Sequence, residues 1–211
     1  MKASVLAASI LLTVSSTVLS AQDWSLHTPT LKKSVYKLES NDGHCSSVLI
    51  NEKDGYLDSA GHCVPEKADG RSVAVDEKHA DVVRLNSVLD LVVVKVSELR
   101  GGTAIALRKE DTVPGLPVGV VGYGFAASNL KFGFGWVSDV RDNSLRGVGD
   151  RLYFSAAGVV PGDSGGAVVD LAGRLVSIVQ GGVCSGAACI AYGAPSGTIE
   201  DFLKSFLPKN P

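Results

Sequence analysis

Short stretches rich in Val, Ile and Leu recur along the chain, and turn-forming residues separate them. Asp54-Gly55, Asp69-Gly70 and Ala172-Gly173 are three such turns. Apolar runs bounded by Gly, Asn, Asp or Pro are typical of strands, and many short strands at regular spacing favour a sandwich or barrels. The sequence therefore predicts an all-β protein. The expected strands are Ser46–Ile50, Arg71–Val75, Asp81–Leu85, Leu89–Val96, Val118–Tyr123, Gly133–Val140, Leu152–Ser155, Ala167–Asp170 and Leu175–Gln180.

A single helix is expected near the end of the chain. Ser196 can cap its first turn, Glu200 and Asp201 suit its positive N-terminal end, and Pro208 ends it. Its apolar residues recur at the spacing of one helical face. They are Ile199, Phe202, Leu203 and Phe206.

The overall charge argues against a nucleic-acid partner. The chain has 211 residues and a formal net charge of −2, so it has no basic field that would attract phosphates. The Gly-rich run 122–135 lacks the Lys-Ser/Thr ending of a phosphate-binding loop, and it is interpreted as a hairpin. His27, His44 and His79 have no neighbours typical of metal ligands, so no metal site is expected there.

Residues 1–21 are expected to form a secretory signal peptide. Lys2 supplies a positive start, an apolar run extends from Val5 to Val18, and Ser20 and Ala21 are small residues suited to cleavage. An uncleaved membrane anchor is the alternative, but Ser and Thr dilute the run and it is only marginally long enough to span a bilayer. We therefore expect a secreted or periplasmic protein without stable membrane association after the signal is removed.

The four cysteines agree with export, because an exported chain can form disulfides. They form two separated pairs, Cys45 with Cys63 and Cys184 with Cys189. Sequence alone permits three connectivities, and pairing within each group is the simplest. Zinc binding is the competing interpretation, but the spacings do not form the short paired knuckles of a zinc site.

Three short stretches carry residues suited to nucleophilic catalysis. They contain His62 in Ser-Ala-Gly-His-Cys, Asp90 in Leu-Asp-Leu-Val-Val-Val, and Ser164 in Pro-Gly-Asp-Ser-Gly-Gly. A hydroxyl is a poor nucleophile at its own pKa, so it needs a base, and the base needs an orienting carboxylate. The surrounding glycines allow a sharp turn, and the amides of Gly162 and Ser164 are candidates to bind an oxyanion.

Each of these residues also has an ordinary structural interpretation. A His beside a Cys is often packed, an Asp before an apolar strand is often a turn residue, and a Gly-Asp-Ser-Gly-Gly run is often a loop. Chain order is an independent test. The order His, Asp, Ser differs from the orders found in subtilisins and α/β-hydrolases.

These stretches resemble the motifs of the chymotrypsin, or trypsin-like, serine protease family. Gly162–Gly166 matches its serine motif without a change, and residues 59–64 are similar to its Thr-Ala-Ala-His-Cys motif. The resemblance covers roughly residues 30–207 and is greatest to small bacterial exported members. It implies that His62, Asp90 and Ser164 form the triad with Gly162 in the oxyanion hole, and that a disulfide joins Cys45 to Cys63.

The resemblance also implies a fold of two antiparallel six-stranded β-barrels with a C-terminal helix. The expected domains are the signal peptide at 1–21 and the protease domain at 22–211. Within the latter, we expect an N-terminal barrel at about 30–105, a C-terminal barrel at about 115–195 and a helix at about 196–207. The run from Gly101 to Pro117 is the candidate connection between the barrels.

The chain departs from the family at several positions. Gly61 replaces Ala before the histidine, and Ala167 follows the serine motif where Pro is common. No Ile-Val-Gly-Gly start is present to pair with Asp163, as it does in zymogen members after cleavage. A buried carboxylate needs a partner, and Arg141 is the candidate. We therefore expect activity once the signal is removed, without a second cut.

The primary specificity pocket is expected to be uncharged. Its base corresponds to Gly158, where trypsin-like members that cleave after Lys or Arg carry Asp, and no cation stands ready for Glu. An apolar residue is therefore expected before the scissile bond, because a charged side chain would lose its hydration without a partner. The other expected substrate-binding residues are Val159, Val179, Gly181, Gly182 and Tyr192.

The sequence thus predicts a secreted serine endopeptidase that acts as a monomer on protein or peptide substrates and needs no cofactor. Two alternatives are weighed against it. One is an inactive protease-fold binding module, which the intact triad and oxyanion glycines disfavour. The other is an esterase or lipase of a different fold, which requires the order Ser, Asp, His.

Overall fold

The computed structural model describes residues 24, 26–41, 43–65, 73–97, 99–141, 150–156, 158–185 and 188–204. The expected signal peptide at 1–21 lies outside the described residues, as do Asp69-Gly70, Phe206 and Pro208. The side chains of Cys184 and Cys189 are also outside the described part of the structure, so the expected pairing between them stays a prediction. Among the described residues, no helix combines the length and apolar character that crossing a membrane requires.

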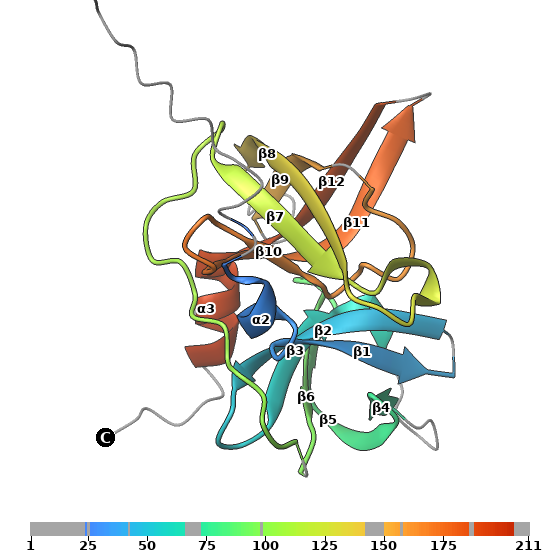
Figure 1. The fold of residues 1–211 in the computed structure, drawn as a ribbon. Coiled ribbons are helices and arrows are strands. Elements are labelled where there is room, and N and C mark those ends of the chain that lie inside the picture. The colour runs from blue at the N-terminus through green and yellow to red at the C-terminus, as the bar shows by residue number, and fades with distance from the viewer. Residues whose placement is uncertain are drawn as a thin grey trace, which may run out of the picture.

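Two closed antiparallel barrels of six strands make up the fold, as predicted (Figure 1). The first closes in the order β1-β2-β3-β6-β5-β4, and the second in the order β10-β11-β12-β9-β8-β7. The first barrel comprises β1 (Val35–Ser40), β2 (Gly43–Asn51), β3 (Tyr56–Ala60), β4 (Val73–Val75), β5 (Lys78–Asn86) and β6 (Leu91–Lys95). The second comprises β7 (Pro117–Gly122), β8 (Lys131–Arg141), β9 (Arg151–Ala156), β10 (Ala167–Val169), β11 (Leu175–Ser185) and β12 (Ala188–Pro195).

Sequence patterns missed three strands for identifiable reasons. β3 carries Asp58 and Ser59, polar residues that interrupt its apolar pattern although both are buried. β1 carries Lys and Glu because part of its surface is exposed, and β12 contains Gly and Pro, which are uncommon in strands. The expected strand at Leu89–Val96 begins instead at Leu91, because Leu89 and Asp90 belong to a turn.

Short helices complete the fold. The expected C-terminal helix is α3 (Ser196–Lys204), and α2 (Thr28–Leu31) precedes the first barrel. Both lie at the side of the molecule where the two barrels meet (Figure 1). Two 3-10 turns, η1 (Gly61–Cys63) and η2 (Gly124–Ala126), follow β3 and β7.

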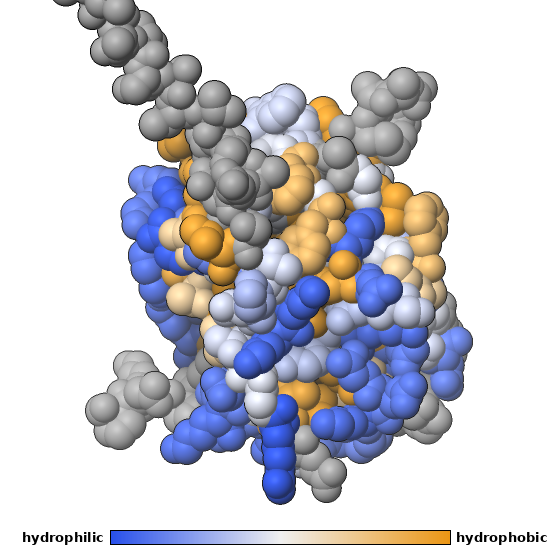
Figure 2. Space-filling model, viewed as in Figure 1, coloured by the Kyte–Doolittle hydropathy of each residue, from blue (hydrophilic) through white to orange (hydrophobic). Residues whose placement is uncertain are grey.

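The apolar core has three parts. Each barrel encloses its own cluster of buried residues, and a third cluster contains residues of both barrels together with Ile199 and Phe202 of α3. The shared cluster fixes one barrel against the other, because separating them would expose its apolar surface to water. On the face shown in Figure 2, hydrophobic side chains gather over the second barrel, where Phe134 and Trp136 are exposed, and the first barrel is mostly hydrophilic.

Candidate active site

His62 and Asp90 lie side by side because β3 and β6 are neighbouring strands. The register pairs Ala60 at the end of β3 with Leu91 at the start of β6. His62 follows the first strand, and Asp90 precedes the second. Gly61 permits the close approach, since a Cβ atom there would lie only 3.2 Å from the Asp90 Cα. An alanine at this position would require the facing backbone to shift by a few tenths of an ångström.

The Asp90 carboxylate accepts hydrogen bonds from two nitrogen atoms of His62. The His62 Nδ1 lies 3.1 Å and 3.0 Å from the two carboxylate oxygens, and the His62 backbone nitrogen lies 2.8 Å from Oδ1. The side-chain hydrogen bond raises the pKa of His62, while partial burial of the ring opposes the rise. Because Nδ1 faces the carboxylate, Nε2 is the ring nitrogen left to exchange a proton.

Ser164 lies in a tight turn of the second barrel. Gly162 and Gly165 adopt φ values of +97° and +80°, which strongly favour glycine. The amides of Asp163, Gly165 and Gly166 each donate to a backbone carbonyl. Among the described residues, the amides of Gly162 and Ser164 donate to no protein group. Two unused amides beside a hydroxyl are the donors that an oxyanion requires.

His62 and Ser164 line one cavity of about 230 Å³ at the junction of the barrels. Pro161 and Gly162 contribute from the second barrel, and the β1–β2 hairpin contributes from the first. The hydrogen bonds of the described residues do not include one between Ser164 and His62. Such a bond is often long before substrate binds, so the shared cavity is the relevant geometry.

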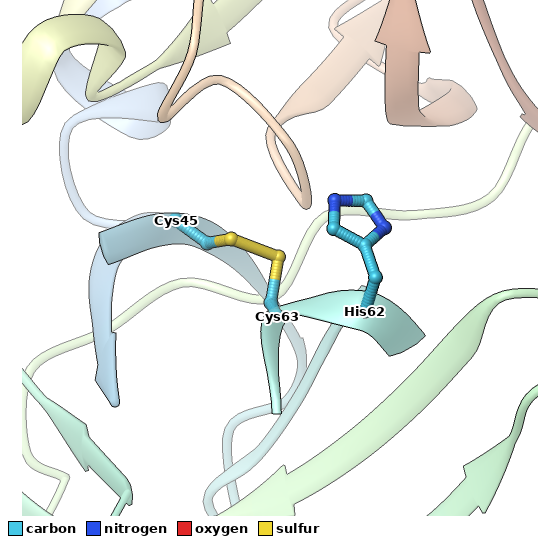
Figure 3. Close-up of side chains that lie close together, drawn as sticks. All are labelled: Cys45, His62 and Cys63. Carbon is cyan, nitrogen blue, oxygen red and sulfur yellow. A yellow bond between two sulfur atoms is a disulfide. The ribbon is translucent and has the colours of Figure 1, made fainter. Parts of the chain in front are cut away.

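A disulfide joins Cys45 on β2 to Cys63 beside His62, which confirms the expected pairing. Figure 3 shows the histidine ring next to this bond, and one ligand atom from each of the three residues lies within 4.8 Å of the others. These residues do not form a metal centre in this state, because zinc binds thiolates and both sulfur atoms are engaged in the disulfide. The bond instead anchors the His62 segment to β2.

Lys131, not Arg141, is the partner of the buried Asp163 carboxylate. The Lys131 ammonium donates to Asp163 Oδ2 and to the Gly158 carbonyl, and the Val160 amide donates to the same Oδ2 at 2.9 Å. The expectation for Arg141 was wrong because its side chain is exposed and pairs with Asp139 at 2.6 Å. The sequence indicated that the buried Asp163 carboxylate needs an internal cation. It did not indicate which cation, because the position of Lys131 depends on where β8 begins.

Gln180 is a further residue that sequence reasoning did not assign to the triad. It is 4% exposed, and its amide nitrogen donates to the carbonyls of Leu89 and Asp90 at 2.6 Å and 2.9 Å. Its oxygen accepts from Arg151 at 3.1 Å. Asp90 has a φ of +52°, which is uncommon outside glycine, and these bonds hold that turn against the second barrel.

The expected pocket residues occupy different environments. Val179 is buried in the core of the second barrel, with Val159 packed against the same cluster, while Gly158 is exposed. Gly181 pairs with Tyr192 across β11 and β12, and a Cβ atom at Gly181 would lie 2.7 Å from the tyrosine hydroxyl oxygen. The aromatic ring therefore fills the space beside Gly181, and a side chain at that position would require the ring to move.

Comparison with known proteins agrees with this geometry. A family model described as the trypsin-like peptidase domain matches residues 45–178. The active form of the Rv3671c protease of M. tuberculosis superimposes with a TM-score of 0.72 at 20% identity, covering 87% of this chain and 85% of that one. Its inactive form gives 0.70 at 21% identity, covering 87% and 93%.

The serine endoprotease of Yersinia pestis is also similar, with a TM-score of 0.70 at 18% identity, covering 86% of this chain and 65% of that one. No curated protein matches the sequence. The structural similarities define the fold as chymotrypsin-like. The chain belongs to the trypsin-like peptidase family. It is a serine endopeptidase.

Proposed function

We propose that this endopeptidase cleaves peptide bonds with a triad of His62, Asp90 and Ser164. The observation that carries the proposal is the Asp90–His62 hydrogen bond at the wall of a cavity that Ser164 shares. An orienting carboxylate, a base and a hydroxyl converge there from both barrels. This is the constellation that activates a weak nucleophile.

The mechanism follows from the roles of the three side chains. Ser164 Oγ attacks the scissile carbonyl carbon, and its proton passes to His62 Nε2. The imidazolium then returns that proton to the leaving amine as the peptide bond breaks, which leaves an acyl-enzyme ester on Ser164. Water enters, gives a proton to His62 and attacks the ester carbonyl carbon. The imidazolium then passes that proton to Ser164 Oγ as the ester bond breaks, which releases the acid product and restores the neutral histidine. Asp90 stays ionised, fixes the tautomer and stabilises the imidazolium.

The amides of Gly162 and Ser164 are proposed to bind the developing oxyanion. Both are free of protein acceptors among the described residues, and both belong to the turn that holds the nucleophile. Donors that are fixed before the reaction stabilise the transition state without reorganisation. In other enzymes, removing one such donor lowers kcat by about 10²–10³-fold.

An apolar residue is proposed before the scissile bond. Gly158 offers no carboxylate for Lys or Arg, and Asp163 neutralises Lys131, the ammonium nearest to Gly158. Gly181, Gly182 and Tyr192 would form an uncharged wall. A Lys or Arg side chain would therefore lose hydration without compensation. The Arg151 guanidinium lies 4.8 Å from the centroid of the Tyr192 ring and is already engaged with that ring and with the Gln180 oxygen.

Export and a monomeric state complete the proposal. The Cys45–Cys63 disulfide indicates an oxidising setting, extracellular or periplasmic, and residues 1–21 have the composition of a secretory signal. Protein or peptide chains are the proposed substrates. Size-exclusion chromatography with light scattering of the exported protein would test the monomer, and terminal sequencing would locate the cleavage after residue 21.

Ser164→Ala tests the triad. We expect a folded protein whose peptidase activity falls by about 10⁴–10⁶-fold, because Ser164 carries the hydroxyl that lies beside the proposed oxyanion amides in the His62 cavity. An active-site fluorophosphonate should label the wild type and not the variant. Ser47→Ala is the control, since Ser47 is buried on the same strand as Cys45 and its hydroxyl faces Tyr36. Most of the activity surviving in Ser164→Ala would reject the triad.

Cleavage-site profiling on a peptide library tests the specificity. We expect a graded preference for aliphatic or aromatic residues before the cut, because each methylene accepted or refused changes the barrier by only about 1–3 kcal/mol. Gly182→Ala is a useful companion variant, as its Cβ would stand in ordinary contact with the Ile190 carbonyl, 3.4 Å away, without disrupting the fold. A profile dominated by Lys, Arg or Glu would contradict the proposed pocket.

A further inference from the structure

Ser46 makes an unusual set of hydrogen bonds between the barrels. It lies on β2 and is fully buried. Its backbone nitrogen donates to the Ser164 carbonyl at 2.7 Å, and its carbonyl accepts from Ser59 Oγ at 2.7 Å. Its own hydroxyl donates to the Gly162 carbonyl at 2.9 Å and accepts from the Tyr123 amide at 2.8 Å. Three of these four bonds reach the second barrel.

The direction of both hydroxyl bonds is fixed by chemistry. The Gly162 carbonyl can only accept and the Tyr123 amide can only donate, so the hydroxyl proton of Ser46 must point at Gly162. The hydroxyl therefore links the turn that carries Ser164 to the segment that leads into η2. No apolar side chain at position 46 could satisfy both backbone groups, and each would be left buried without a partner.

The same segment fixes the preceding peptide group. The Phe125 amide of η2 donates to the Pro161 carbonyl at 2.7 Å. In a trans peptide the carbonyl and the following N–H point in opposite directions. Because the Pro161 carbonyl faces η2, the Gly162 N–H faces away from η2. The Tyr123 amide donates to the Ser46 hydroxyl, and Tyr123 lies only two residues before Phe125. The same hydroxyl therefore supports the peptide group before Gly162, through the Tyr123–Phe125 segment, and the peptide group after it, through the Gly162 carbonyl.

We propose that the Ser46 hydroxyl is a positioning residue of the reaction, which holds the peptide groups around Gly162 so that the Gly162 N–H points at the substrate oxyanion. This inference rests on the proposed triad and oxyanion amides. Ser46 touches no reacting atom, and it acts through the Gly162 carbonyl and the Tyr123–Phe125 segment. Glycine adopts the left-handed φ of +97° at Gly162 without steric cost but is equally free to leave it, so these hydrogen bonds are what fix the conformation.

A purely structural role for Ser46 would have different consequences. A hydroxyl that only joins the barrels would change the melting temperature and the fraction of folded enzyme, and each folded molecule would keep its normal turnover. A hydroxyl that orients the Gly162 amide changes turnover per active site. It also changes the affinity for compounds that form a tetrahedral adduct with Ser164, since only these use the oxyanion amides.

Ser46→Ala in the exported chain is the experiment. Active-site titration gives the concentration of competent enzyme, and kcat and KM are measured on a peptide ester that the wild type cleaves. We expect kcat to fall about 10–100-fold with KM nearly unchanged, somewhat less than the loss of an oxyanion donor itself. The affinity for a peptide aldehyde with an aliphatic terminal residue should fall by a similar factor, while the affinity for the matching peptide alcohol, which forms no adduct, should not.

Ser47→Ala is the matched control. Ser47 is the next residue on β2, is also fully buried, and its hydroxyl faces the Tyr36 carbonyl at 3.4 Å inside the first barrel. Ser47→Ala should keep kcat and aldehyde affinity at the wild-type values. If Ser46→Ala folds poorly, Ser46→Gly removes the same hydroxyl without adding a side chain, and the same kinetic changes are expected in it.

The inference is overturned if both hydroxyl-deleting variants keep wild-type kcat and aldehyde affinity, or if Ser47→Ala loses as much as they do. Ser164→Ala is assayed in parallel. Activity that survives in Ser164→Ala would reject the proposed triad, whereas an inactive Ser164→Ala beside a fully active Ser46→Ala would reject only the role of Ser46.

Discussion

Asp90 combines two tasks at a single residue. Its carboxylate orients His62, and its left-handed backbone, with a φ of +52°, brings the carboxylate to both the ring and the main-chain nitrogen of His62. Gln180 holds the Asp90 carbonyl from the opposite barrel. The proposed catalytic base is thus aligned through its ring and its main-chain nitrogen by the carboxylate of one residue, and the side-chain bond raises its pKa.

The pH profile of the enzyme should report this pair. His62 must be neutral to accept the Ser164 proton, so activity rises with pH through the pKa of His62, which the Asp90 hydrogen bond raises. Asp90→Asn should lower kcat by about 10⁴-fold and shift the acidic limb of the residual activity to lower pH, because the charge that favours the imidazolium is gone. A pH series of kcat/KM measures both effects. An unshifted acidic limb would show that Asp90 does not set the pKa of His62.

The stability of the folded state should show the same pair with a defined sign. Because the folded pKa of His62 is raised above its ordinary value of 6.5, its contribution is fully present below that value. It is lost as pH rises through the folded pKa.

At the scale of elements, β8 supplies the cation that pairs with Asp163, a role that the resemblance to zymogen members would give to a new chain terminus. Lys131 at the start of β8 binds Asp163 and the Gly158 carbonyl, and so connects this strand to the turn before Ser164. The cation is built into the fold and needs no cleavage to arrive. We therefore expect residues 22–211 to be active without a second cut near residues 24–40.

Lys131→Met tests that connection. It leaves the buried Asp163 carboxylate without a cation, so the free energy of unfolding should fall by about 3 kcal/mol, at the low end for a broken buried pair because Lys131 is partly exposed. Activity should fall more steeply than the folded fraction, because the turn before Ser164 loses its support. Adding Asp163→Asn should recover part of the stability. Arg141→Met is the control, and an equal loss in that variant of an exposed pair would contradict the assignment.

The elements that position the site differ in how well they could be predicted. The motifs around His62, Asp90 and Ser164 are short and local, so the sequence predicted which side chains to bring together and the Cys45–Cys63 bond beside them. Ser46 and Gln180 act by bonding to backbone atoms far away in the chain, and Lys131 pairs with the carboxylate of the equally distant Asp163. No local pattern marks such contacts, because the carbonyl or amide that they bind belongs to every residue type. They depend on the register of the two barrels.

At the scale of the whole molecule, the two barrels meet across one shared apolar cluster, and the proposed catalytic residues come from opposite sides of that junction. The ionisable side chain of Asp58 lies at this junction. It is fully buried on β3, and its cross-strand partners Val48 and Val93 both belong to the shared cluster. Directly opposite residues share a face of the sheet, so the carboxyl group faces the same apolar layer.

Neither oxygen atom of Asp58 accepts a hydrogen bond of regular geometry among the described residues. Burial raises the pKa of this carboxyl well above its ordinary value of 3.8, and the nearby Ser59 amide opposes that rise only in part. A raised folded-state pKa gives a contribution to stability that is fully present below pH 3.8. That contribution is lost as pH rises toward the folded pKa, since only the unfolded chain ionises freely. The junction of the barrels is therefore weakened at neutral pH by a group that the reaction does not use.

Asp58→Asn should remove this dependence while keeping the size of the side chain. We expect the variant to match the wild type in stability near pH 3.8 and to exceed it increasingly as pH rises, because the asparagine amide does not ionise in the unfolded chain. Urea unfolding at a series of pH values measures the difference.

Asp58→Val, which resembles the flanking Val48 and Val93, should show the same trend with a constant offset from burying an apolar side chain. Asp81→Asn on exposed β5 is the control and should leave the pH dependence nearly unchanged. A stability difference between Asp58→Asn and wild type that stays constant from acidic to neutral pH would show that the carboxyl ionises in the folded protein as readily as in the unfolded chain.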